Sequence, residues 1–308
     1  MNIIRSIKQF LVICFLPIFL FISCDGKPPK MVEEKTTNLL VKKEEETELG
    51  LFNKRWASDT LWQNGTIEKI RYRVFDEESG KSYEEIWETR STLFSKQFYN
   101  ESTDSTRKDL FSTMTLSRQR FATNDDLTSF SLQVSILTRD YFEPVRLQFH
   151  GHENGKMTSK ILKRLMGRTV IYTHCYQGEF GDGEIELGKE IFLEEQLPLS
   201  LRAINFNLQV EGGITFYRST YSSLSHLEYE APALREVEYH VGTIDSLDLN
   251  GKIQLAIPIT ANFTGRGGTN KTDRYWFDSQ FPHSLLQAEW DNGLTLKIIS
   301  KEYLAPRK

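Results

Sequence analysis

Apolar and polar side chains alternate along much of this chain with a period of two residues. Ile70, Tyr72 and Val74 alternate with arginines, and the same pattern covers residues 130–136 and 145–150. Successive side chains of a β-strand point to opposite faces, so this period is typical of strands with one buried and one solvated face. Antiparallel sheets tolerate a solvated face. The pattern therefore predicts a mainly β fold with few helices.

Turn-forming residues separate these stretches. Glu78-Ser79-Gly80-Lys81, Asn154-Gly155, Asn250-Gly251 and Asn292-Gly293 each lie between strand-like segments. Asparagine and glycine adopt the positive φ angles that tight hairpins need, so consecutive strands are expected to pair as a single antiparallel meander. A long meander twists and curls. We therefore expect an open or half barrel whose concave face packs against one or two helices or an apolar ligand.

Two segments have helical rather than strand-like spacing. Apolar pairs at Leu51-Phe52, Trp56-Ala57 and Leu61-Trp62 predict an amphipathic helix at the start of the domain. Pro198 is placed like a first-turn proline, and apolar residues follow it at helical spacing. No internal repeat of fixed period occurs, so a single β-rich domain is predicted over residues 51–308.

Composition excludes several classes of protein. Of the 308 residues, 39% are hydrophobic and 26% are charged, which excludes a disordered tail, a collagen-like fibre and a multi-span membrane protein. The formal net charge is -4, so the chain has no excess of cations to neutralise a phosphate backbone. Nucleic acid is therefore not an expected partner.

The N-terminus has the pattern of an export signal. Arg5 and Lys8 precede an apolar run over residues 10–22. This arrangement predicts a signal peptide over residues 1–23. A short membrane helix that stays in place is the alternative, although the run is shorter than the roughly 20 residues that cross a bilayer and Pro17 interrupts it.

The end of this signal, Phe21-Ile22-Ser23-Cys24, resembles the lipobox of bacterial lipoproteins, although Phe21 replaces the usual leucine. In lipoproteins the cysteine thiol receives a diacylglyceryl group and becomes the new N-terminus. The resemblance implies that Cys24 is lipidated and that its acyl chains give a durable membrane anchor. It also implies a location in the bacterial cell envelope, in the periplasm or at the outer membrane.

The stretch after the lipobox differs in composition from the rest of the chain. Residues 25–50 are rich in Lys, Glu, Thr and Pro and cannot bury enough apolar surface to fold. Residues 24–50 are therefore predicted to be the lipidated cysteine and a flexible tether. A short charged helix over residues 32–49 is the alternative.

Common catalytic motifs are missing from the sequence. Neither Gly-x-Ser-x-Gly nor His-Glu-x-x-His occurs, so no catalytic residue is assigned and a non-enzymatic role is expected. Cys14 leaves with the signal peptide and Cys24 carries lipid, so Cys175 has no disulfide partner. Cys175 is then either a buried inert thiol or a nucleophile.

Two weaker patterns have the ligand types of a metal site. His150 and His152 lie on the same side of a predicted strand, a spacing compatible with a transition metal. The competing interpretation places both in solvent at the end of a hairpin. Asp182, Glu184 and Glu186 share one face of an extended segment, where they would bind calcium, act in acid-base chemistry, or form an exposed loop. No cofactor is predicted.

The C-terminal region carries a resemblance to a family. The segment 273–278, then Pro282, Leu285-Leu286 and residues 290–293, looks like a hairpin found in uncharacterised bacterial lipoproteins of a domain of unknown function. Residues 138–156 form an earlier copy of the pattern. Such families are similar to lipoprotein-carrier half-barrels, in which a curved antiparallel sheet wraps a helix or two and shelters acyl chains. The resemblance implies a fold and a class of ligand, without catalytic residues.

These features leave three hypotheses for function. The first is an envelope lipoprotein whose curved sheet binds a lipid or acyl chain. The second is an envelope scaffold that binds a protein or glycan through exposed aromatic side chains: Tyr217, Tyr221, Tyr229 and Tyr239. The third is a metal-dependent enzyme that uses the His150 and His152 pair or the Glu184 and Glu186 pair.

Overall fold

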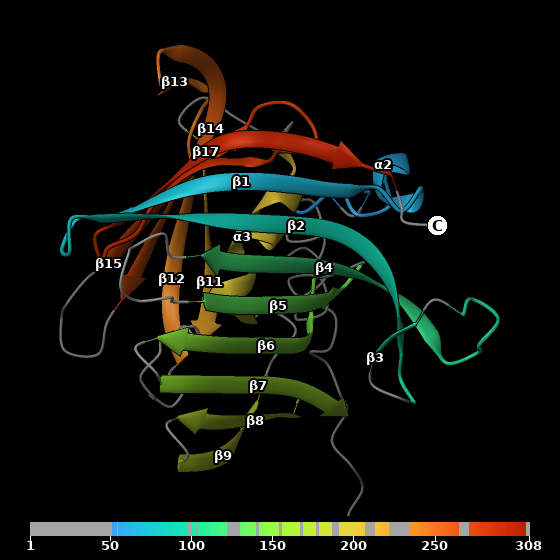
Figure 1. Ribbon diagram of the computed structural model, residues 1–308. Helices are drawn as coiled ribbons and strands as arrows, with labels where there is room; N and C mark the ends of the chain where they lie inside the picture. The colour runs from blue at the N-terminus through green and yellow to red at the C-terminus, as the bar shows by residue number, and fades with distance from the viewer. Residues whose placement is uncertain are drawn as a thin grey trace, which may run out of the picture. The chain divides into compact units, whose positions relative to one another are not determined.

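The computed structural model describes residues 51–53, 55–97, 100–102, 104–121, 130–139, 142–153, 156–166, 169–176, 179–186, 191–206, 213–221, 234–264 and 271–305. Within these ranges seventeen strands belong to one sheet and helical turns are few, which confirms the predicted mainly β fold (Figure 1). Residues 47–308 form one compact unit. The predicted signal peptide, Cys24 and the tether lie outside the described residues, as does Tyr229. No described helix has the length and apolar character to cross a bilayer.

One half of the sheet is a meander of neighbouring strands. At its start, β1 (Ile67–Asp76) pairs with β2 (Lys81–Ser95), and the short β3 (Asn100–Ser102) pairs with the end of β2. The antiparallel order then continues through β4 (Leu110–Phe121), β5 (Phe130–Thr138), β6 (Pro144–Glu153), β7 (Lys156–Met166), β8 (Thr169–Tyr176) and β9 (Glu179–Glu186). This half has the connectivity that the hairpin signals predict.

The other half of the sheet is attached to β1 through the last strand of the chain, β17 (Leu294–Leu304). From β17 the antiparallel order continues through β16 (Leu285–Glu289), β15 (Lys271–Asp278), β14 (Lys252–Thr264), β12 (Leu234–Val241) and β11 (Ile214–Tyr221). The remaining strand, β13 (Asp245–Leu249), pairs with the first part of β14.

One pair of strands departs from the expected antiparallel arrangement. The short β10 (Ile191–Leu193) pairs in parallel with β11, so the sheet is mixed. Parallel neighbours need a long crossover connection, and the chain between β10 and β11 contains the longest helical run that the structure describes. The helix inferred near Pro198 is therefore the element that makes this parallel pair possible.

The glycine turns are confirmed where the structure describes them. Asn250 and Gly251 join β13 to β14 with φ angles of 57° and 82°. Both angles are positive, as a two-residue hairpin turn requires. Gly80 and Gly293 also have positive φ, whereas the predicted turn at Asn154-Gly155 lies outside the described residues.

The predicted N-terminal helix over residues 51–62 is wrong in extent. Among the described residues of this segment, Leu51 and α2 (Thr60–Gln63) are helical, and α2 begins at Asp59, whose side chain accepts a hydrogen bond from the Leu61 amide at 2.9 Å. Earlier in the segment, Phe52 forms an isolated bridge with Ile204. Tertiary contacts of the aromatic residues therefore override their helical spacing.

The helical run between β10 and β11 is buried almost throughout. It consists of η1 (Glu194–Gln196), α3 (Leu197–Ser200) and η2 (Leu201–Ala203), and we call these ten residues the helical cover. Pro198 lies in the first turn of α3, as predicted. Every residue from Glu195 to Ala203 is buried. A helix that is buried all round must be surrounded by the rest of the protein.

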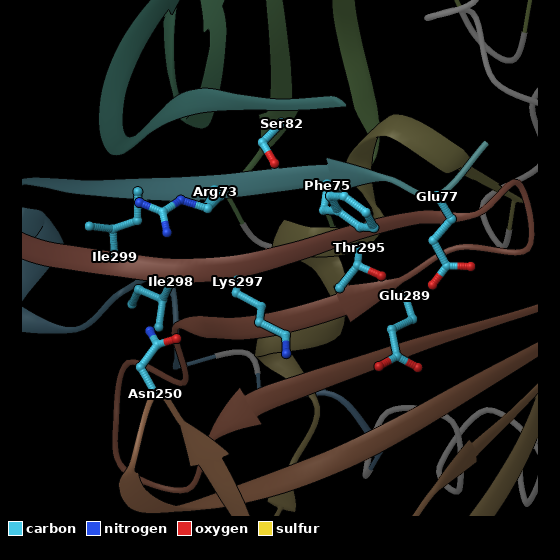
Figure 2. A pocket seen from close by; sticks show the side chains of 10 residues that line it. All are labelled: Arg73, Phe75, Glu77, Ser82, Asn250, Glu289, Thr295, Lys297, Ile298 and Ile299. Carbon is cyan, nitrogen blue, oxygen red and sulfur yellow. The ribbon is translucent and has the colours of Figure 1, made fainter. Parts of the chain in front are cut away.

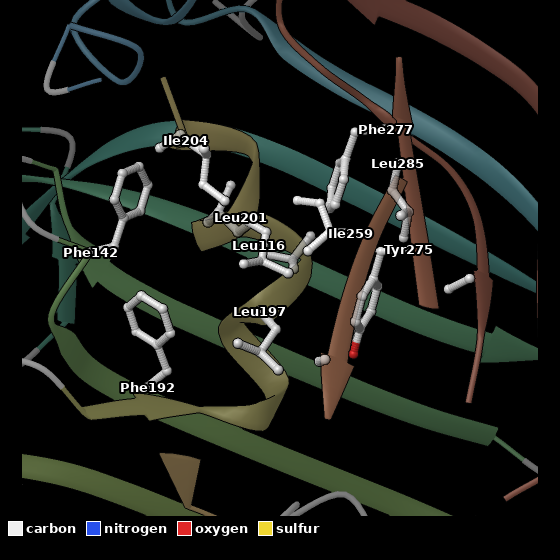
Figure 3. Close-up of a cluster of buried hydrophobic side chains, with 14 of the residues drawn as sticks. Leu116, Phe142, Phe192, Leu197, Leu201, Ile204, Ile259, Tyr275, Phe277 and Leu285 are labelled. Carbon is white, nitrogen blue, oxygen red and sulfur yellow. The ribbon is translucent and has the colours of Figure 1, made fainter. Parts of the chain in front are cut away.

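The sheet curls around the helical cover. Leu116 of β4 and Ile259 of β14 belong to one hydrophobic cluster together with Leu197 and Leu201 of the cover (Figure 3). In the sheet β14 and β4 are six pairing steps apart, which is about 29 Å in a flat sheet at about 4.8 Å per step. Contact with one short helix therefore requires strong curvature. We call the face that packs against the cover the inner face, and the opposite one the outer face.

The two edges of the curled sheet meet through side chains. Leu147 and Leu162, from β6 and β7, share a cluster with Leu193 of β10 and Tyr221 of β11. The Tyr221 hydroxyl donates a hydrogen bond to the Glu186 carbonyl at the end of β9, at 3.2 Å. Among the described strands no ladder joins β9 to β10 or β11, so the sheet is not closed into a barrel.

In β5 the expected faces are reversed. The alternation predicts that apolar residues such as Val134 face the main core, but Gln133 and Ser135 occupy the inner face, where Ser135 pairs with Leu116. Ile136 instead packs in a separate cluster with Phe94 and Val145, beside an irregular step in the register between β5 and β6. At Gln133 and Ser135 the inner face of β5 is therefore buried and polar, whereas Leu137 on the same face belongs to the main core.

Candidate functional site

The helical cover is fixed to the sheet by a buried ion pair. Arg202 Nη1 and Nη2 lie 2.6 and 3.0 Å from the two carboxylate oxygens of Glu68 on β1. The two side chains are 4% and 0% exposed. Ser284 Oγ also donates to Glu68 at 2.5 Å, and Arg202 Nε donates to the Pro282 carbonyl at 3.1 Å. A bidentate contact between a guanidinium and a carboxylate fixes both the distance and the relative orientation of the two groups.

Two tryptophans enclose the Arg202 guanidinium. Its central carbon lies 5.1 Å from the ring centre of Trp56 and 5.9 Å from that of Trp62. The Trp56 indole N–H donates to the same Pro282 carbonyl at 3.1 Å. The rings exclude water and add cation-π attraction to the ion pair. The aromatic residues at the start of the domain therefore hold one end of the helical cover.

Gln196 holds the other end of the helical cover. Its amide nitrogen donates to the Phe142 carbonyl at 3.0 Å and to Ser200 Oγ at 2.8 Å, and its amide oxygen accepts from the Leu193 N–H at 3.0 Å. The side chain is fully buried. Both ends of the cover are thus held by polar contacts, whereas its middle contributes leucine side chains to the core.

A second charged cluster lies on the inner face beside the cover. Glu85 accepts hydrogen bonds from Arg118 Nη2 at 3.3 Å, Arg120 Nε at 3.2 Å and Trp87 Nε1 at 2.8 Å. Burial alone raises the pKa of Glu85, but the two guanidinium groups and the indole outweigh it and lower the pKa below its usual value. Glu85 is therefore ionised at neutral pH. The cluster lines a small pocket of about 100 Å³ together with Tyr83 and Pro198.

Four buried polar atoms on the inner face have no hydrogen-bond partner within the described part of the chain. They lie on the adjacent strands β2, β4 and β5 and are Tyr83 Oη, Arg118 Nε, Gln133 Nε2 and Ser135 Oγ. Arg118 pairs with Gln133 in the register, and Tyr83 packs under the Arg120 guanidinium, whose carbon is 4.2 Å from the ring centre. Each of these atoms can donate a hydrogen bond. Buried donors of this kind call for a bound water or a polar ligand atom.

Asp273 is a buried carboxyl near the same pocket. Burial is the main cause that raises its pKa to about 6, although its carboxylate accepts from the Asp291 N–H at 3.0 Å and from the Tyr275 hydroxyl at 3.3 Å. Tyr275 lines the pocket. The local charge on this side of the pocket therefore changes close to neutral pH.

The histidines singled out as weak metal candidates lie on the outer face of β6. His150 lies on the outer face of β6, where its ring contacts the Gln148 side chain; burial and the nearby Arg146 charge lower its pKa. His152 is exposed on the same face. The described residues include no group of three potential ligands that could hold a metal ion.

The other candidate groups lie on separate strands. Asp182, Glu184 and Glu186 are exposed as expected, but they lie on one face of strand β9, so the predicted exposed loop is wrong. Cys175 is half-buried in β8 as a free thiol. Of the tyrosines that the scaffold hypothesis uses, Tyr217 is 69% exposed, but Tyr239 is fully buried and stacked on Phe216 with ring centres 5.0 Å apart. Tyr221 is buried as well, so the predicted exposed aromatic surface is wrong for these two residues.

The residues that form the two charged clusters were not predicted from the sequence. Glu68 continues the buried set of Ile70 and Tyr72 in β1, and Arg118 continues that of Leu116 in β4. A charge at an apolar position of an alternating strand is the signal that identifies such residues. The identity of the partner, Arg202, is not visible locally because 134 residues separate it from Glu68.

Comparison with known proteins leaves the family open. No protein-family model and no curated protein matches the chain. A solved structure similar to this one is a beta-barrel-like protein of the domain of unknown function DUF1849 from Brucella abortus. Its TM-score is 0.44 and its identity 10%, over 78% of this chain and 98% of that chain.

Asp273 predicts a stability change near neutral pH. Its folded pKa of about 6 exceeds the ordinary value of 3.8, so the folded state binds the proton more tightly and this contribution to stability is lost as pH rises from about 4 through 6. Asp273→Asn mimics the protonated form. Urea unfolding is expected to show the variant gaining up to about 3 kcal/mol over the wild type at pH 8, and no gain at pH 3.5. An equal difference at both pH values would contradict this.

Proposed function

We propose that this chain is a non-enzymatic lipoprotein of the bacterial cell envelope, anchored through Cys24, that binds a lipid or acyl chain on the inner face of its curved sheet. The observation that carries the proposal is an apolar core beside four buried polar atoms on the same face that have no hydrogen-bond partner among the described residues. A lipid has the matching chemistry, because its acyl chain is apolar and its head carries hydrogen-bond acceptors.

The polar end of the ligand would lie against β2, β4 and β5. Arg118 Nε and Gln133 Nε2 are neighbours in the register, and Ser135 follows on the same face of β5. A buried donor without an acceptor costs about 1 to 3 kcal/mol, and an ester or carboxylate oxygen at this place would remove that cost. The Arg118 guanidinium, shared with Glu85, also provides positive charge.

The acyl chain would take the place of the helical cover's leucines. Leu197, Leu199 and Leu201 are fully buried on the inner face, and the cover that carries them is held at its ends by Arg202 and Gln196. Each buried methylene gives about 0.8 kcal/mol, so a sixteen-carbon chain offers on the order of 10 kcal/mol against the cost of displacing the cover.

Native mass spectrometry of residues 47–308, exported to a bacterial periplasm with an ordinary cleavable signal, tests the ligand. We expect an added mass that disappears on organic extraction. Gln133→Leu removes an unpartnered inner-face donor and is expected to reduce that mass, while Gln119→Leu makes the same change on the outer face of β4 and leaves it unchanged. A bare protein mass, or equal loading in both variants, would contradict the proposal.

The anchor is tested separately by metabolic labelling. Radiolabelled palmitate is expected to enter the full chain and to be lost in Cys24→Ala, because this thiol is the expected attachment point. Membrane sedimentation of the two proteins gives a second readout, and the variant is expected in the soluble fraction. Label in the variant, or its unchanged sedimentation with membranes, would overturn the anchor.

A further inference from the structure

The outer face carries a groove that is separate from the inner-face site. Its volume is about 540 Å³, and it lies along β1 and β17 with the β13–β14 turn at one side (Figure 2). Exposed side chains line it in the order Arg73 and Phe75, both of β1, and Glu77, which follows the strand. Pockets of a few hundred cubic ångströms are of the size that holds a small ligand.

Two of the residues that line this groove are cations on neighbouring strands. Arg73 of β1 and Lys297 of β17 occupy directly paired positions on the outer face. Like charges at paired positions of antiparallel strands repel and destabilise the sheet. Neither side chain has a salt bridge within the described part of the chain, whereas Lys69 and Arg71 on the same strand reach carboxylates at 3.5 and 2.7 Å. A bound anion would supply the missing negative charge.

The carboxylate that lies opposite Arg73 forms an ion pair with a different arginine. Glu84 of β2 lies opposite Arg73 in the register, but its carboxylate pairs with Arg71. Within the groove, Glu289 lies 3.8 Å from Arg274 and also accepts from the Gln287 amide at 2.9 Å. The positive end of the groove is thus formed by Arg73 and Lys297.

An exposed aromatic ring lies next to the two cations. Phe75 is 42% exposed, follows Arg73 on the same face of β1 and pairs with Thr295 of β17. The face of an aromatic ring is electron-rich and packs well against weakly positive C–H groups. Beyond the ring, the Glu77 carboxylate lines the opposite end of the groove, and Asn250 lines one side.

We propose that this groove binds an acidic saccharide, a sugar that bears a carboxylate or phosphate group. Its anionic group would lie between Arg73 and Lys297, because a guanidinium matches the geometry of such oxygens. Its ring would pack on Phe75. Its hydroxyl groups would bond to Glu77, Thr295 and Asn250, which provide both donors and acceptors around the ring.

Isothermal titration calorimetry of the full chain in detergent tests the ligand class with four probes: glucuronate, glucose 1-phosphate, glucose and inorganic phosphate. The two acidic sugars are expected to bind at least tenfold more tightly than the other two. Equal affinity for glucose would remove the role of the cations, and equal affinity for phosphate would reduce the groove to a simple anion site. Either result overturns the proposal.

Variants of the lining residues test whether the ligand binds in the groove. Arg73→Gln and Phe75→Ala are each expected to weaken glucose 1-phosphate binding at least tenfold, and both side chains are exposed enough to be changed without loss of the core. Lys69→Gln removes a cation from the same strand and face outside the groove, and is expected to bind as the wild type does. Unchanged affinity in Arg73→Gln, or equal loss in Lys69→Gln, would overturn the assignment.

Discussion

The buried pair of Arg202 and Glu68 is the interaction on which the arrangement of the inner face depends. Burying two charges costs free energy, so the value of such a pair is seldom its net contribution to stability. Here each charged group makes a further hydrogen bond: Glu68 accepts from the Ser284 hydroxyl, and Arg202 donates to the Pro282 carbonyl. Leucine side chains pack acceptably in several registers. The ion pair selects one position of the helical cover against the sheet.

The curvature of the sheet separates two chemically different surfaces. The inner face combines a tightly packed core with buried donors around Arg118 and Gln133. The outer face of the central strands is charged and solvated, and Arg73 with Lys297 forms its positive groove. Alternation along each strand places neighbouring residues on opposite faces, so β1 contributes Tyr72 to the core and Arg73 to the groove. The two proposed sites therefore have separate sets of residues and can be altered independently.

The sequence predicted most of the strands and turns because those depend on local chemistry. The period of two in β1 and the Asn250-Gly251 turn need only neighbouring residues, and Pro198 marks the helix start in the same way. The prediction of a helix over residues 51–62 was wrong because Trp56 and Phe52 form long-range contacts with Pro282 and Ile204. The spacing of apolar residues in the sequence does not show that these two aromatic side chains prefer long-range contacts.

The candidate site was less predictable than the fold. Gln133 and Ser135 look like a solvated face, but the register with β4 places them on the inner face opposite Arg118 and Leu116. Glu68 and Arg118 stand out locally as charges in apolar series, but their partners depend on the tertiary fold. The histidines and the β9 carboxylates had suitable types and spacing, but within the described ranges they form no group of three potential ligands.

Hydrogen exchange of the backbone amides in residues 194–203 tests most directly whether the ion pair positions the helical cover. In Glu68→Gln, compared with Glu302→Gln as an exposed-pair control, we expect the cover to exchange at least tenfold faster while β1 and β17 keep their protection. Unchanged exchange in the cover would contradict the account. So would an equal acceleration in all three elements, since the pair would then act on global stability alone.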